Sequence, residues 1–127
     1  MLPTSDRLRP VTVDTRRGAD QLRRILETLA RVELTDGLTL AELVMETSAR
    51  LPRDATVVAI VPQASPEAAL ALGGLRRRGF AVTVVLVMHD DDLYAESAGR
   101  LIAAGVDVLR IEDEAAVSSF CSRQMVR

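Results

Sequence analysis

The chain has 127 residues, of which 48% are apolar and 27% are charged, and its formal net charge is −2. This length fits a single domain with its own core, and the apolar fraction excludes general disorder. Its apolar runs are far shorter than the ~20 residues of a membrane helix, and its charge excludes a generic polyanion binder. We therefore expect no membrane span and no nucleic-acid partner.

The cysteine content and the N-terminal sequence favour a cytoplasmic protein. Cys121 is the one cysteine, so it cannot form an internal disulfide, and a reducing compartment is expected. Residues 1–17 carry acids and several arginines without the apolar core of a secretory signal. We expect residues 1–16 to form an arm or a short strand, and residues 17–127 to form a single α/β domain.

Two helices are predicted before the first long apolar segment. From Arg17, apolar residues follow the i, i+3, i+4, i+7 spacing of a helix that ends at Gly37. Its apolar positions are Leu22, Ile25, Leu26, Leu29, Ala30 and Val32. Thr39 and Glu42 then match the capping box of a second helix, which ends at Leu51 before a proline. Its expected buried face comprises Leu40, Leu43, Val44 and Thr47.

The rest of the chain alternates between strands and helices. Thr56–Val61 is apolar, β-branched and non-alternating, which is typical of a strand buried on both faces. Ser65, Pro66 and Glu67 then form a strong helix start. This helix covers 66–78, and strands at 80–87 and 106–111 alternate with helices at 93–104, capped by Asp91 or Asp92, and from Asp113 to Met125.

This order predicts a three-layer α/β/α fold with a small parallel sheet of three core strands. The crossovers are long enough only for parallel pairing. Right-handed crossovers place helices 66–78 and 93–104 on one face. We expect the two earlier helices and the last one to cover the other face.

The first core strand then lies at a sheet edge, where an uncovered apolar strand is a pairing liability. Either the segment around Val11 covers it, or another chain does, or a larger parent protein supplies neighbouring strands. We expect an interaction edge at Thr56, Val58 and Ile60, used by a protein partner or by self-association.

A second candidate site lies at the carboxyl ends of the strands, where open parallel sheets bind ligands. Gln63 and Ser65 follow the first strand, and His89 and Asp90 follow the second. The helix start at Ser65 can attract an anion, which supports a small-molecule or nucleotide-binding domain. However, no Gly-rich loop follows any strand. We predict no metal site at 89–92, because consecutive residues cannot all point at one ion.

The remaining polar clusters have structural interpretations. Residues 76–78 are arginines that compensate a helix dipole, and Gly73 and Gly74 indicate close packing of that helix against the sheet. Cys121 is expected in the core of the last helix, far from the only histidine. Since no acid–base pair or nucleophile stands out, we predict no catalytic residue, no cofactor and no enzymatic activity.

Three blocks carry a more specific resemblance. They read GADQLRRILETLARVELTDGLTLAELV, LPRDATVVAIVPQASPEAALALGGLRRRGFAVTVVLV and AGRLIAAGVDVLRI. In this order they resemble the C-terminal half of bacterial von Willebrand factor A-like proteins of the domain of unknown function 58 family. The resemblance implies half of a doubly wound, Rossmann-like sheet of order 3-2-1-4-5-6, with strands 4-5-6 present. It also implies a MoxR-type AAA+ ATPase as partner.

The metal site of von Willebrand A domains does not carry over to this chain. Residues 1–17 contain no DxSxS motif. Leu38 stands where the family has its Thr, with Thr39 beside it, and Pro62-Gln63 stand where the family has an Asp. The leading hypothesis is therefore a non-enzymatic protein-interaction module without a metal, and the alternative is a ligand-binding α/β domain.

Overall fold

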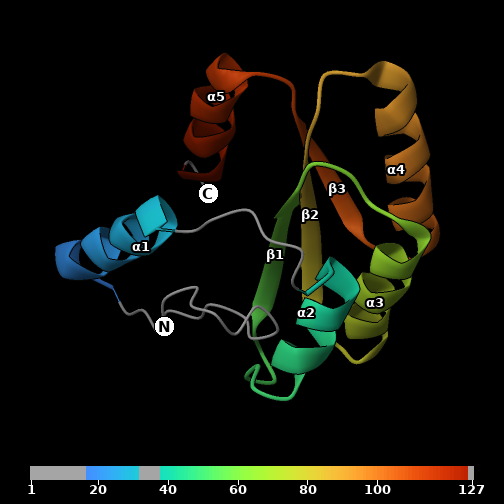
Figure 1. The fold of residues 1–127 in the computed structure, drawn as a ribbon, viewed down its shortest axis with the longest axis horizontal. Helices are drawn as coiled ribbons and strands as arrows, with labels where there is room; N and C mark the ends of the chain where they lie inside the picture. Colours follow the sequence, from blue (N-terminus) through green and yellow to red (C-terminus); the bar gives the residue numbers. More distant parts are fainter. Residues whose placement is uncertain (1–16, 32–37, 126–127) are drawn as a thin grey trace. The chain divides into compact units, whose positions relative to one another are not determined.

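The computed structural model describes residues 17–31 and 38–125 (Figure 1). The chain divides into two compact units, Met1–Glu46 and Thr47–Arg127. The arm or strand expected for residues 1–16 and the helix end expected at Gly37 lie outside the described residues.

The first unit contains helix α1 (Ala19–Arg31) and most of helix α2 (Leu40–Ser48). Both helices are confirmed, but neither contains a buried residue, and the apolar side chains expected to form a buried face on α2 are only half-buried. Thr39 caps α2 as predicted, because its Oγ1 accepts the Glu42 N–H at 3.2 Å. In a capping box, the Glu side chain also accepts the backbone N–H of the cap residue. Here Glu42 Oε1 instead accepts the Thr39 hydroxyl, so this bond joins the two side chains.

The second unit is an α/β fold with a three-stranded parallel sheet, as predicted. Strands β1 (Thr56–Val61), β2 (Ala81–Val87) and β3 (Asp107–Ile111) lie in the order β1-β2-β3. Thr56 pairs with Ala81, and Thr83 pairs with Asp107. Helices α3 (Pro66–Arg77) and α4 (Asp91–Ala103) connect the strands, and α5 (Glu114–Met125) follows β3.

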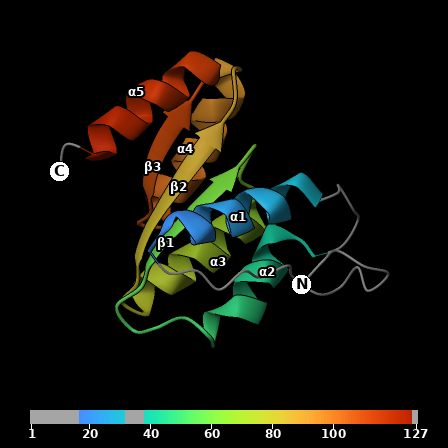
Figure 2. The same ribbon diagram turned by 90° about the vertical axis from the view of Figure 1, so that its left-hand side faces the viewer.

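Helices of this unit lie on both sides of the sheet (Figures 1 and 2). Helices α3 and α4 cover one face, while α5 lies beside β3 on the opposite side. The core forms under α3 and α4, where the pleat of β2 points Val82, Val84 and Leu86 toward Leu72 and Leu101. Burial of these side chains holds the helices on the sheet.

Within the described part of the second unit, helices cover only one face of the first strand, whereas its sequence predicted cover on both faces. Exposure alternates along β1, with Val61 buried and Val58 and Ile60 exposed by 56% and 70%. The reason is topological: α3 and α4 pack on one face only, and α5 packs against β3, two strands away. The many β-branched residues of this segment therefore indicate strand propensity and not burial on both faces.

The helix ends follow capping chemistry, with one correction. Ser65 Oγ accepts the Ala68 N–H at 3.1 Å, and Asp113 Oδ1 accepts the Ala116 N–H at 2.8 Å, as predicted. Helix α4 is capped by Asp90, not by Asp91 or Asp92. Its Oδ1 accepts two backbone N–H groups at 2.9 Å, and the helix begins at Asp91, two residues earlier than expected.

Gly73 packs closely, but against a helix end and not against the sheet as expected. A Cβ at Gly73 would lie 2.9 Å from Ala104 Cβ and 3.1 Å from the Ala104 carbonyl oxygen. The missing side chain therefore lets α3 approach the C-terminal end of α4. A Cβ at Gly99 would meet nothing within 4 Å.

We expect Gly73→Ala to lower the free energy of unfolding by about 1–2 kcal/mol, because overpacking outweighs the gain in helix propensity. Gly99→Ala is the matched control in α4, and it should stabilise by about 0.5–1 kcal/mol. Urea unfolding of both variants measures the difference. Equal stabilisation by the two substitutions would contradict the close contact.

Candidate functional site

The expected ligand residues lie in two loops at the carboxyl ends of β1 and β2. Gln63 and His89 are exposed, and their side chains form no hydrogen bond with the part of the chain that the structure describes. Ser65 and Asp90 use their side-chain oxygens as helix caps. The four polar side chains at this end of the sheet are thus divided: those of Gln63 and His89 are available, and those of Ser65 and Asp90 are occupied as helix caps.

Arg110 makes most of the polar side-chain contacts at the carboxyl end of β2, a role that the sequence did not predict. Its guanidinium donates to the carbonyls of Met88 (3.3 Å) and His89 (2.8 Å). It also forms ion pairs with Asp91 at 2.8 Å and Glu112 at 3.2 Å, although both carboxylates are largely exposed. Its Cζ lies 4.6 Å from the centroid of the Tyr94 ring.

These contacts fix the loop that carries His89. The Arg110 side chain is only 17% exposed, so its hydrogen bonds to backbone carbonyls form in partly desolvated surroundings, where charge-assisted bonds are strong. The position of Arg110 in β3, next to Leu86 of β2, aims the guanidinium at the end of the neighbouring strand.

The loop after β1 is fixed by α4. The buried Ser97 hydroxyl oxygen accepts the Ala64 N–H at 3.3 Å, and Arg100 donates to the Ala64 carbonyl at 3.1 Å. Arg100 also pairs with Glu96 one helical turn earlier. Both backbone groups of Ala64 are therefore satisfied by side chains of one helix, which positions Gln63 and Ser65.

Neither the side chains that commonly ligate metals nor the single cysteine forms a site among the described residues. Within residues 17–31 and 38–125, no three His, Cys, Asp or Glu side chains are grouped so that they could hold a metal ion. Cys121 is exposed, whereas the sequence suggested a core position. The described side chains of α5, including Cys121, are exposed or half-buried.

A pocket at the opposite end of the sheet was not expected. It lies at the amino ends of β1 and β2 and is lined in part by Arg53, Arg78 and Phe80. A sequence signal for it exists: Arg53 lies three residues before β1, and Arg78 lies three residues before β2. Because the amino ends of paired parallel strands are adjacent, such residues are brought together.

Comparisons with protein-family models, with curated proteins and with solved structures find no match to this chain. Among the described residues, no helix has the length and apolarity needed to cross a membrane.

We expect Ser97→Ala to lower the free energy of unfolding by about 1–3 kcal/mol, because the N–H of buried Ala64 loses its acceptor. Ser118→Ala is the control on exposed α5 and should change it by no more than about 0.5 kcal/mol. Urea unfolding provides the comparison. A Ser97 variant as stable as the Ser118 variant would show that the bond contributes nothing.

We expect Arg110→Lys to destabilise the second unit by about 1–3 kcal/mol, since an ammonium cannot reproduce the forked hydrogen bonds. The Met88 amide, which donates to the Ile111 carbonyl at 3.1 Å, should then exchange its hydrogen faster. Hydrogen exchange with NMR detection measures this effect. Arg77→Lys, at an exposed position of α3, is the control, and unchanged Met88 protection in Arg110→Lys would refute the role of the guanidinium.

Proposed function

We propose that this chain is a non-enzymatic protein-interaction module whose contact surface is the edge strand β1. The observation that carries the proposal is that β1 is an apolar strand of six residues at the sheet edge, without a charged side chain and with Val58 and Ile60 exposed. Natural edge strands are usually shortened, charged or covered. The other edge strand, β3, is shorter and carries Asp107 and Arg110.

The partner we propose for this edge is a second copy of the chain. Antiparallel pairing of two β1 strands around a two-fold axis extends both sheets into one. In the register centred on Ala59, Val58 of one copy faces Ile60 of the other. Cross-strand pairs of β-branched residues of this kind stabilise a sheet.

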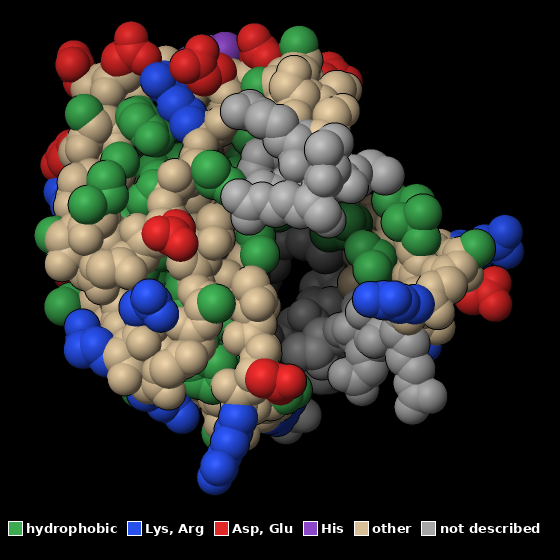
Figure 3. Space-filling view, turned by 180° about the vertical axis from the view of Figure 1, so that it is seen from behind, with side chains coloured by type: hydrophobic (Ala, Val, Ile, Leu, Met, Phe, Trp, Pro, Cys, Tyr) green, Lys and Arg blue, Asp and Glu red, His purple; other side chains and the backbone are tan. Residues whose placement is uncertain are grey.

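Charge complementarity supports the antiparallel arrangement. In the second unit, acidic side chains gather at the carboxyl end of the sheet and cations gather mostly at the amino end (Figure 3). The acids are Asp90, Asp91, Asp92, Glu112, Asp113 and Glu114; the cations are Arg50, Arg53, Arg76, Arg77 and Arg78, with Asp54 and Asp107 among them. Antiparallel strands bring the acidic end of one copy beside the basic end of the other, which favours association at low salt.

The family resemblance supports a finer version of the same proposal. If this chain corresponds to strands 4-5-6 of a von Willebrand A-like sheet, β1 occupies the position that pairs with a preceding strand in the complete fold. The same resemblance also implies a MoxR-type AAA+ ATPase as a further partner, in addition to the second copy that pairs at β1. A cytoplasmic location is part of this proposal, since a single cysteine suits a reducing compartment.

The alternative function is a small-molecule or nucleotide-binding domain that uses the crevice at Gln63, Ser65, His89 and Asp90. The available side chains of Gln63 and His89 favour it. Ser65 and Asp90 contribute less, because their oxygens are already engaged as caps. A thermal-shift screen with small ligands and nucleotides tests this alternative, and His89→Ala should abolish any shift that arises in the crevice.

We expect Ile60→Lys to prevent self-association, because it places a charge on the uncovered part of the edge strand. Sedimentation at increasing protein concentration should show the mass of the native chain rising toward a dimer. The variant should weaken dimerisation by at least about tenfold, which corresponds to about 1.4 kcal/mol.

The control for this experiment is Ile102→Lys on α4. It changes the same residue type at a nearly equal exposure, 65% against 70%. This variant should associate like the native chain. A native chain that remains monomeric at all concentrations, or equal behaviour of the two variants, would refute self-association through β1.

A further inference from the structure

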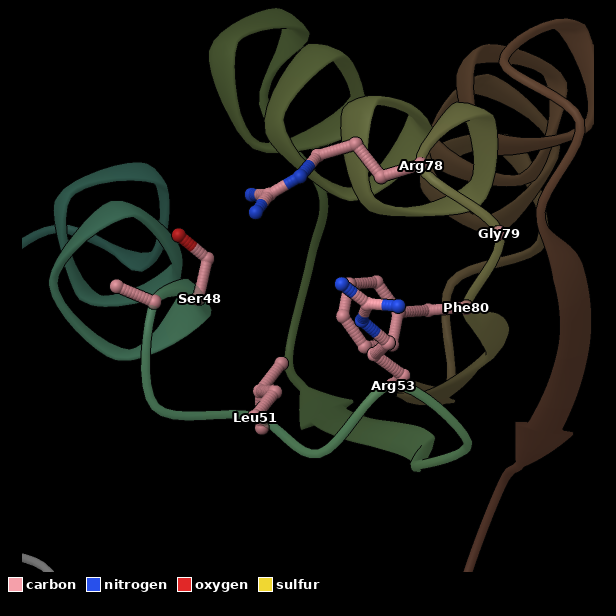
Figure 4. A pocket seen from close by; sticks show the side chains of 7 residues that line it. Ser48, Leu51, Arg53, Arg78, Gly79 and Phe80 are labelled. Atoms are coloured by element: carbon pink, nitrogen blue, oxygen red, sulfur yellow. The ribbon is translucent and has the colours of Figure 1, made fainter.

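The second unit contains a basic pocket at the amino ends of its first two strands. The pocket has a volume of about 340 Å³. It is lined by Ser48, Ala49, Leu51, Arg53, Arg78, Gly79 and Phe80. Figure 4 shows Arg78 reaching from the end of α3 toward the Ser48 side, and Arg53 rising in front of the Phe80 ring.

Strand pairing explains why these residues meet. Thr56 and Ala81 are paired at the start of β1 and β2, so the segments that lead into the two strands run side by side. One segment carries Arg53 and the other carries Arg78 and Phe80. Gly79 turns the chain between α3 and β2 with a φ of +100°, a conformation that suits glycine.

Among the described residues, the two cations of the pocket have no acidic partner. Neither Arg53 nor Arg78 forms an ion pair with any residue in the described part of the chain. Arg78 instead lies over an aromatic ring, with its Cζ 5.9 Å from the Phe80 centroid, and Phe80 is buried. An aromatic ring below a guanidinium limits the hydration of that face. The N–H groups at the edge of the guanidinium stay available to donate to a ligand.

We propose that this pocket binds a small phosphate monoester. Two guanidinium groups offer planar, forked donors that match the oxygens of a phosphoryl group, and Phe80 and Leu51 provide apolar surface for the organic part. The pocket volume lies in the range of small-molecule sites, and it suits one compact ligand better than an extended polymer chain. The C-terminal dipole of α3 opposes an anion here, and Arg76 and Arg77 in its last turn offset that field.

This site is distinct from the β1 edge and from the crevice at the carboxyl ends of the strands. It does not rest on self-association, because all seven lining residues belong to one copy of the second unit. If the pocket binds no phosphate ester, the proposed self-association through β1 is unaffected. If the chain stays monomeric, the proposed binding site is unaffected.

The test is titration of the full chain with inorganic phosphate, phenyl phosphate and a nucleoside monophosphate, followed by calorimetry and by amide NMR shifts. We expect saturable binding with shifts centred on Gly79 and Phe80. Tighter binding of phenyl phosphate than of inorganic phosphate supports an organic ester as the ligand. Equal binding of the two would overturn the ester and leave free phosphate as the ligand.

Variants locate the site. Arg53→Gln and Arg78→Gln each remove one guanidinium from an exposed position and should weaken binding by about tenfold or more. Arg76→Gln removes the same charge from the same helix end outside the pocket lining, and it should weaken binding by no more than about twofold. Absence of saturable binding, or an equal loss in all three variants, would overturn the proposal.

Discussion

The parallel pairing of β2 with both neighbours is the constraint on which the other features of the second unit depend. It places β1 at an edge, and it brings the amino ends of β1 and β2 together and their carboxyl ends together. Arginines precede β1 and β2, and acids follow β2 and β3, so the same pairing separates most of the charge along the unit. The basic pocket and the acidic loops are two results of one strand arrangement.

The two ends of the sheet differ in how their loops are held. At the carboxyl end, Arg110, Ser97 and Arg100 bond to backbone groups of the connecting loops, which fixes those loops and engages the cations. At the amino end, Arg53 and Arg78 bond to no described carboxylate. A cation without a described counter-charge is a better candidate for binding an external anion than one already paired, and this favours the basic pocket over the carboxyl end of the sheet as an anion site.

Expectations based on neighbouring residues agreed well with the structure. The strand Thr56–Val61 is confirmed at both ends, and Ser65 and Asp113 cap their helices as predicted. The cap of α4 was misplaced by one or two residues, since three consecutive acids compete for that position and only the fold selects Asp90. Gly73 indicated close packing, but its partner, Ala104, is more than thirty residues away and gave no local signal.

The sequence by itself determined which segments form strands and helices, because caps, glycine turns and apolar periodicity act over a few residues. From the order of these elements it also determined that the strands are parallel. Only the tertiary structure decided that one face of β1 is uncovered, that Arg110 holds the His89 loop, and that Arg53 and Arg78 share a pocket. Each of these depends on which distant surfaces pack together, and packing is a property of the whole unit that no short stretch of sequence specifies.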